Sequence, residues 1–248
     1  MKILAIDTSG SYCSVAVGGD VLRPVLVEDD TALSHSARLL AMIESALSEA
    51  GHGMDGLDAV AVTIGPGSFT GLRIGVAVAQ GLAYGQRVPV VTASSLQQVA
   101  AQVHVEEQGG VVLVSLDARM AEVYAGWYEI DSLQPRCLGR EHVIAANRLL
   151  ETVPEACTFE DGKLALEQGR KAAGLLLAGG GFSAYDDVPQ QLLQADAPGL
   201  SSCTLEQRCA LRPNAQTLLR LAQHKLVDGD VCHPAALKPV YLRDKVTG

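Results

Sequence analysis

The first residues of the chain alternate between apolar and polar positions, turn, and alternate again. Residues 2–6 are apolar-rich, residues 7–11 are polar and begin with Asp7, and residues 12–17 return to the apolar pattern. This arrangement predicts a β-hairpin with an aspartate-led turn. A third strand is predicted over residues 21–28, and Pro24 places it at a sheet edge because proline cannot donate to a ladder.

Helical periodicity follows. Leu39, Ile43 and Leu47 recur at four-residue spacing and predict a helix with Ser34 as its N-cap and Gly51 as its stop. An apolar run at 59–64 predicts a buried parallel strand. The glycine-rich stretch 65–71 then opens a helix that is expected to reach Gly85. A strand at 88–91 and a helix at 95–104 complete this half.

The start of the chain is repeated near its middle. Residues 3–7 match 113–117, and residues 14–17 match 124–127, at a constant offset of 110 positions. A repeat near half the chain length predicts two domains of one ancestral fold, which we place at 1–105 and 106–248. The second half is expected to contain strands at 136–144 and 175–178, a helix at 145–153, and a terminal helix at about 213–228 that packs back on the first domain.

Composition excludes several classes of protein. The 248 residues carry 19 Lys+Arg against 28 Asp+Glu, a net charge of −9, and 48% are hydrophobic. The apolar fraction argues against disorder, and the acidity argues against a protein that grips nucleic acid or an anionic membrane by itself. The sequence contains no apolar run of 18 residues, and the N-terminal apolar run is too short for a signal peptide, so we expect a cytoplasmic chain.

Metal and nucleophile motifs are missing from the sequence. The six cysteines form no CxxC pair and the six histidines form no HxxxH or HExxH pattern. We therefore predict no metal ligands and no catalytic residue.

Three glycine-containing stretches are candidate functional features. Residues 65–71 lack the lysine of a Walker A loop and the third glycine of a dinucleotide fingerprint. The small residues Gly71, Gly75, Ala79 and Ala83 form a helical stripe that packs either on the chain's own sheet or on another subunit.

The turn that starts at Asp7 either closes the hairpin or holds a phosphate or Mg²⁺. The candidate ligands are Asp7, Thr8, Ser9 and Gly10.

Several segments together resemble a known family. Residues 3–9 (ILAIDTS) resemble the first phosphate-loop strand of the actin/Hsp70/sugar-kinase superfamily. Residues 63–75 (TIGPGSFTGLRIG), 35–40 (HSARLL) and 116–119 (LDAR) resemble the TsaB (YeaZ) family within it. The resemblance covers essentially the whole chain. It implies an α/β fold of two tandem actin-like (ribonuclease H-like) domains related by duplication, with mixed sheets flanked by helices.

The resemblance also implies a function. TsaB subunits serve the formation of N6-threonylcarbamoyladenosine next to the anticodon of tRNAs that read ANN codons. They act as scaffolds that form a heterodimer with the catalytic paralogue TsaD and reach the ATPase TsaE through it, or form a homodimer when TsaD is absent. The resemblance implies that the chain contacts tRNA only within the complex and that ATP and Mg²⁺ are bound only by partner subunits. It implies no interaction with a membrane. Pairing through two helices of the first domain implicates His35, Leu39, Ile43, Gly71, Leu72, Gly75 and Ala79.

The chain departs from the catalytic paralogue at the metal site. TsaD carries an HxxxH motif shortly after a strand like 88–91, and the corresponding positions here are Ser95 and Val99. Neither residue supplies an imidazole, which predicts a non-catalytic subunit. The alternative is an ATP-binding small-molecule kinase or ATPase of the same superfamily, in which the Asp7 turn holds phosphate and the glycine run 179–181 holds adenosine.

Overall fold

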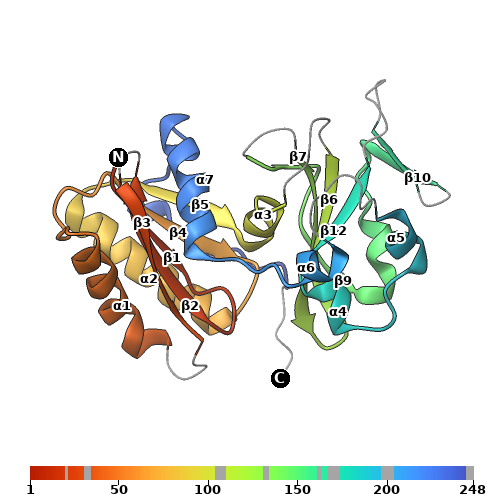
Figure 1. Cartoon of the computed structure of the whole chain (residues 1–248), viewed down its shortest axis with the longest axis horizontal. Helices are drawn as coiled ribbons and strands as arrows, with labels where there is room; N and C mark the ends of the chain where they lie inside the picture. The colour runs from red at the N-terminus through yellow and green to blue at the C-terminus, as the bar shows by residue number, and fades with distance from the viewer. Residues whose placement is uncertain are drawn as a thin grey trace. The chain divides into compact units, whose positions relative to one another are not determined.

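The chain forms two compact units, which are described separately. The computed structural model describes residues 1–19, 22–30, 35–103, 110–130, 134–160, 163–166, 174–196 and 204–243. One unit comprises Met1–Gln98 and Pro213–Tyr241, and the other comprises Val99–Arg212 and Leu242–Gly248 (Figure 1). The predicted boundary between residues 105 and 106 falls outside the described residues and stays a prediction.

The first unit is built on a five-stranded mixed sheet. Its strands are β1 (Ile3–Asp7), β2 (Cys13–Gly19), β3 (Leu22–Asp29), β4 (Ala59–Gly65) and β5 (Val90–Ser94), in the order β3-β2-β1-β4-β5. β1 pairs antiparallel with β2 and parallel with β4. The predicted hairpin is therefore confirmed, and the strand that contains Pro24 is an edge strand as expected.

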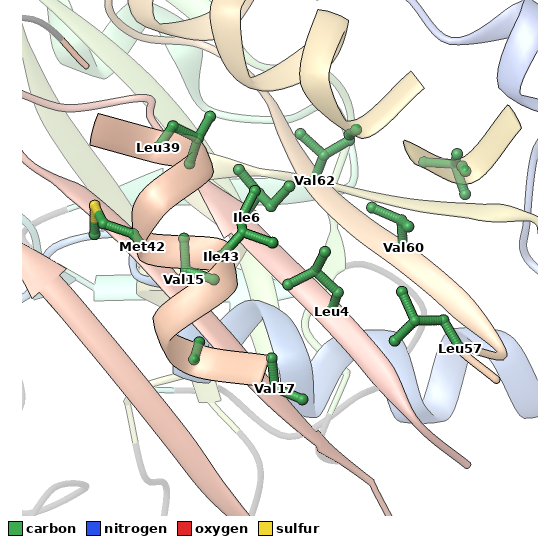
Figure 2. Close-up of a cluster of buried hydrophobic side chains, with 14 of the residues drawn as sticks. Leu4, Ile6, Val15, Val17, Leu39, Met42, Ile43, Leu57, Val60 and Val62 are labelled. Carbon is green, nitrogen blue, oxygen red and sulfur yellow. The ribbon is translucent and has the colours of Figure 1, made fainter. Parts of the chain in front are cut away.

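Helices cover both faces of this sheet. α1 (His35–Glu49) and α2 (Phe69–Gln86) pack on one face, where apolar side chains of β1, β2 and β4 meet them. Figure 2 shows Leu39, Met42 and Ile43 of α1 directed at the strand side chains. α7 (Ala215–Val227) packs on β1 and β2, and the side chain of Leu219 lies against Gly18 of β2. Ser34, the predicted cap of α1, lies outside the described residues.

Two short helices complete the first unit and its border. α3 (Ser95–Ala100) begins where predicted but ends before the expected limit at residue 104, which falls outside the described residues. A 3₁₀ helix, η3 (Pro234–Ala236), follows α7 and packs on α2.

The second unit repeats the topology of the first. β6 (Gly110–Arg119) and β7 (Glu122–Ile130) form an antiparallel pair, and β12 (Leu175–Ala178) runs parallel to β6, as β4 does to β1. With β8 (Arg136–Cys137) and β9 (His142–Ala145), the sheet order is β12-β6-β7-β8, and β9 also pairs with β7. The predicted fold class, two mixed sheets flanked by helices, is confirmed. The remaining elements are η1 (Ala146–Thr152), β10 (Cys157–Glu160), β11 (Lys163–Leu166), α4 (Gly181–Ala184), α5 (Gln190–Ala195) and α6 (Leu205–Cys209).

One prediction in the second unit is wrong, and a second is refined in the type of helix. The strand expected over 136–144 is two strands, because Gly139 takes a left-handed φ of 129° and turns the chain between them. The helix expected over 145–153 is the 3₁₀ helix η1, which sets Thr152 so that its hydroxyl accepts from the indole N–H of Trp127 at 2.8 Å.

A buried ion pair braces the end of β12. Arg208 of α6 is 1% exposed, donates from Nε to the carbonyl of Leu177 at 2.9 Å, and pairs with Asp196 at 2.5 Å.

Among the helices in the described part of the chain, none combines the length and apolar character that a membrane crossing needs.

Candidate functional site on β1, α1 and α2

The predicted phosphate-loop turn begins with a buried aspartate. Asp7 ends β1 and is completely shielded from solvent. Its carboxylate accepts the N–H and the hydroxyl of Ser9, each at 3.0 Å, the amide of Gln98 at 3.3 Å, and the hydroxyl of Thr63. Burial raises the pKa of Asp7, and these hydrogen bonds oppose that rise. The carboxylate is thus satisfied inside the protein.

The other residues of this turn are also engaged. The hydroxyl of Thr8 donates to the carbonyl of Gly71 at 2.7 Å, and the N–H of Ser68 donates to the carbonyl of Ser9 at 2.7 Å. A Cβ on Gly10 would lie 2.9 Å from the ring of Tyr12. These contacts favour the hairpin-turn interpretation of residues 7–10 over the phosphate interpretation.

Glycines bring α2 directly against this turn. α2 begins after Ser68, whose hydroxyl accepts the N–H of Gly71 at 3.2 Å. A Cβ on Gly67 would overlap the carbonyl of Ser9, and Cβ atoms on Gly71 and Gly75 would overlap atoms of Thr8. The glycine-rich stretch therefore lets a helix approach a strand end, and no ligand is needed to explain it.

The second unit packs its glycine run in the same way. Gly179 has a φ of 95°, and Cβ atoms on Gly179 and Gly181 would overlap Ser115 of β6. Asp117, the repeat of Asp7, is exposed and accepts the N–H of Arg119 at 2.7 Å and the hydroxyl of Tyr185 at 2.6 Å. Close packing therefore explains Gly179 and Gly181, which the kinase alternative assigned to adenosine binding.

Ser95 and Val99, the positions that we matched to the paralogue's histidines, make contacts within the chain. The hydroxyl of Ser95 donates to the carbonyl of Pro66 at 2.5 Å, and Val99 is fully buried. Within the described ranges, no group of three or more His, Cys, Asp or Glu side chains is placed to hold a metal ion.

The residues that we assigned to a subunit interface lie on the inner sides of α1 and α2. Leu39, Ile43, Leu72 and Ala79 are at most 3% exposed, and Gly71 and Gly75 are buried against Thr8, the residue that follows β1. These residues pack within the chain itself, and their assignment to a subunit interface stays a prediction. His35 is the first residue of α1, and its side chain is outside the described part.

The opposite side of the same two helices is exposed. Helices α1 and α2 lie next to each other (Figure 1). Leu40 of α1 is 54% exposed, and Tyr84 of α2 is 66% exposed. A Cβ on Gly81 or Gly85 would meet no neighbouring atom within 4 Å. We call the following exposed residues the outer face: Leu40, Phe69, Arg73, Ala77, Gly81, Tyr84 and Gly85.

The outer face begins with an aromatic–arginine cluster that sequence reasoning missed. The guanidinium of Arg73 lies 3.7 Å from the ring centroid of Phe69 and 5.7 Å from that of Tyr241. The Nε of Arg73 donates to the hydroxyl of Tyr241 at 2.9 Å. The four-residue spacing of Phe69 and Arg73 was a usable signal. Tyr241 gave none, because it arrives from a distant segment that is anchored by the bond from the Val240 N–H to the Ile64 carbonyl.

Comparison with known proteins places the chain in a family. A family model described as TsaD, tRNA N6-adenosine threonylcarbamoyltransferase, matches residues 27–247. The Haemophilus influenzae tRNA threonylcarbamoyladenosine biosynthesis protein TsaB is 30% identical over 257 residues, which cover 100% of this chain and 95% of that protein. The chain belongs to the TsaB family.

Two further relatives agree with that assignment. TsaB of Escherichia coli K12 is 31% identical over 247 residues, which cover 99% of this chain and 96% of the relative. The structure of YeaZ from Pseudomonas aeruginosa superimposes with a TM-score of 0.76 at 32% identity and covers 97% of this chain and 99% of that one. This TsaB-family chain therefore has the two-domain actin-like fold that its own topology shows.

Proposed function

We propose that this chain is a non-catalytic subunit in the formation of N6-threonylcarbamoyladenosine in tRNA, and that it acts by pairing with a TsaD-family transferase. TsaE joins through that transferase, and a homodimer forms when the transferase is absent. The proposal starts from the family: the relatives described above are named for tRNA threonylcarbamoyladenosine biosynthesis. The chain's own surface supports the scaffolding and pairing parts of the proposal.

The outer face of α1 and α2 is the observation that carries the proposal. Ala77, Gly81 and Gly85 are exposed and recur at four-residue spacing. A Cβ atom on Gly81 or Gly85 would have no neighbouring atom within 4 Å. Glycine in a helix interior costs about 1 kcal/mol relative to alanine, so a stripe that gains no internal packing has another use. Small residues flanked by Leu40 and Tyr84 let a partner helix approach closely and bury the two large side chains.

The non-catalytic part of the proposal is supported by what Ser95, Val99 and Asp7 do within the chain. Ser95 and Val99 stand where the paralogue's metal-binding histidines are expected, and both are committed to internal packing or hydrogen bonding. Asp7 accepts its hydrogen bonds from the protein itself. These residues maintain the fold and leave the transferase to supply the reacting groups.

A reconstituted reaction tests the proposal. The transferase, TsaE, a threonylcarbamoyl-AMP source and an unmodified tRNA are assayed with and without this chain, and light scattering measures the mass of each mixture. We expect a complex of the chain with the transferase and a strong dependence of tRNA modification on it. Full modification without the chain would contradict the scaffold role.

A matched pair of variants tests the face. Gly81→Arg adds a long charged side chain to the outer face at a position with open space, and we expect it to abolish the complex. Gln216→Arg adds the same side chain to the exposed side of α7 in the same unit and is expected to leave the complex intact. Equal assembly of both variants would exclude the outer face as the pairing surface.

A further inference from the structure

Arg73 is the only charged residue of α2, whose sequence is FTGLRIGVAVAQGLAYGQ. It is exposed, and it forms no ion pair with any residue in the described part of the chain. The chain as a whole carries a net charge of −9. Even so, within the described residues it supplies no carboxylate partner for Arg73.

The side chain of Arg73 is nevertheless held in one place. Phe69 lies under the guanidinium, and Tyr241 contacts it from a second side and accepts its Nε–H. The two rings are themselves in tilted contact, with centroids 5.3 Å apart. Exposed arginines normally lose conformational entropy when they bind, and the contacts with Phe69 and Tyr241 restrict this side chain before a partner arrives. The two terminal nitrogens are the donors that remain, and they form a planar fork that matches a carboxylate.

The cluster is continuous with the outer face. Phe69, Arg73, Ala77 and Gly81 follow one another at four-residue intervals along the same side of α2. A partner that covers Ala77 and Gly81 therefore also removes water from Arg73. A charge that loses its water is costly unless an opposite charge replaces it.

We propose that the cluster formed by Phe69, Arg73 and Tyr241 receives a carboxylate side chain, aspartate or glutamate, of the partner protein. The carboxylate accepts two hydrogen bonds from the terminal nitrogens of Arg73, and the two aromatic rings exclude water around the pair. This inference rests on the proposed function, because the partner is the transferase that covers the outer face.

A protein carboxylate fits these observations better than an RNA phosphate. Binding to RNA draws on several cations that act together, and α2 offers one. Tyrosine and arginine are enriched among the residues that contribute most of the binding energy of protein interfaces.

The inference is tested by affinity measurements on the complete chain with the transferase. Arg73→Gln keeps a polar side chain and removes the charge, and we expect the dissociation constant to rise at least about tenfold. Arg73→Lys keeps the charge without the fork and should recover only part of the loss. Arg140→Ala removes an exposed arginine from the other unit and serves as the control, with unchanged affinity expected.

The acceptor is found by a double-mutant cycle. Exposed Asp and Glu residues of the transferase are changed one at a time to Asn or Gln and are combined with Arg73→Gln. One of these positions should weaken the wild-type complex and have no further effect on the Arg73→Gln complex. A cycle without coupling at any position would overturn the inference.

The outcomes separate this inference from the proposed function. If the wild-type chain forms no complex with the transferase, the proposed function fails and the inference fails with it. If the wild-type complex forms and Arg73→Gln leaves its affinity unchanged, only the inference is overturned. Loss of tRNA binding by the assembled complex, with unchanged protein affinity, would assign Arg73 to a phosphate instead and would likewise overturn it.

Discussion

Asp7 is the residue that the sequence nominated for a phosphate, yet here it is enclosed. Four donors, contributed by Ser9, Thr63 and Gln98, fill its oxygen atoms. The same environment raises the pKa of the nearby Cys13 thiol to about 12, mainly through burial and then through the charge of Asp7. The end of β1 is therefore a buried structural junction, and we expect its titration to affect stability.

Replacement of Asp7 tests that role through pH. Burial raises the pKa of Asp7 above its ordinary value of 3.8, so the folded chain holds this proton at pH values where the unfolded chain has released it. Stability from this group is present below about pH 4 and is lost as the pH rises through the folded pKa. Asp7→Asn removes the titration and keeps an oxygen for Thr63.

The measurement is urea unfolding of both proteins across the acid-to-neutral range. We expect the free energy of unfolding of the wild type to fall relative to that of Asp7→Asn as the pH is raised. The comparison uses the difference between the two proteins, which cancels titrations common to both. Parallel curves would show that Asp7 has the same pKa in the folded and unfolded states.

At the scale of elements, α2 shows why one helix sequence could be interpreted in two ways. Small residues line both of its sides: Gly71, Gly75, Ala79 and Ala83 on one, and Ala77, Gly81 and Gly85 on the other. Spacing alone identifies each stripe but does not tell which packs on the sheet. The structure decides this, because Thr8 lies against Gly71 and Gly75 while Gly81 faces open space.

Two alanine substitutions in α2 separate the stripes. A Cβ at position 75 would overlap the hydroxyl oxygen of Thr8, so Gly75→Ala must displace α2 or β1 and should lose about 1–3 kcal/mol of stability. Gly81→Ala meets no atom and should gain up to about 1 kcal/mol from helix propensity. Chemical denaturation of both variants checks the signs. Equal effects would mean that the two glycines have equivalent environments.

How far the sequence predicts each element depends on where its signal comes from. The β1–β2 hairpin, β4, α2 and β12 carry local patterns, and all were predicted near their observed bounds. The helices α4, α5 and α6 are too short to show a repeated pattern of apolar residues at helical spacing, so their formation depends on packing against β6 and β12. The same holds for the candidate site. The helices that carry it were predicted from local patterns and are present. Which of their residues are buried depends on tertiary packing, which a local pattern does not show.

At the scale of the whole molecule, the net charge of −9 limits how a tRNA-modifying system can use this chain. Affinity for RNA comes largely from cations that displace counterions from phosphates. A TsaB-family subunit with 19 basic and 28 acidic residues is poorly suited to supply them. We therefore expect its partners to make most of the phosphate contacts while this chain contributes the outer face to assembly.

This division of labour predicts how tRNA binding depends on composition and salt. The isolated chain should bind tRNA weakly, in a range no tighter than the non-specific affinities of about 10⁻⁴–10⁻⁶ M, whereas the assembled complex should bind more tightly and lose affinity steeply as salt rises. Filter binding or fluorescence anisotropy at several salt concentrations measures both. Gly81→Arg provides an internal check, because it adds a positive charge yet should lower tRNA binding by the mixture if assembly is what creates the binding surface. Tight, salt-sensitive binding by the chain alone would instead place the main RNA contacts on this subunit.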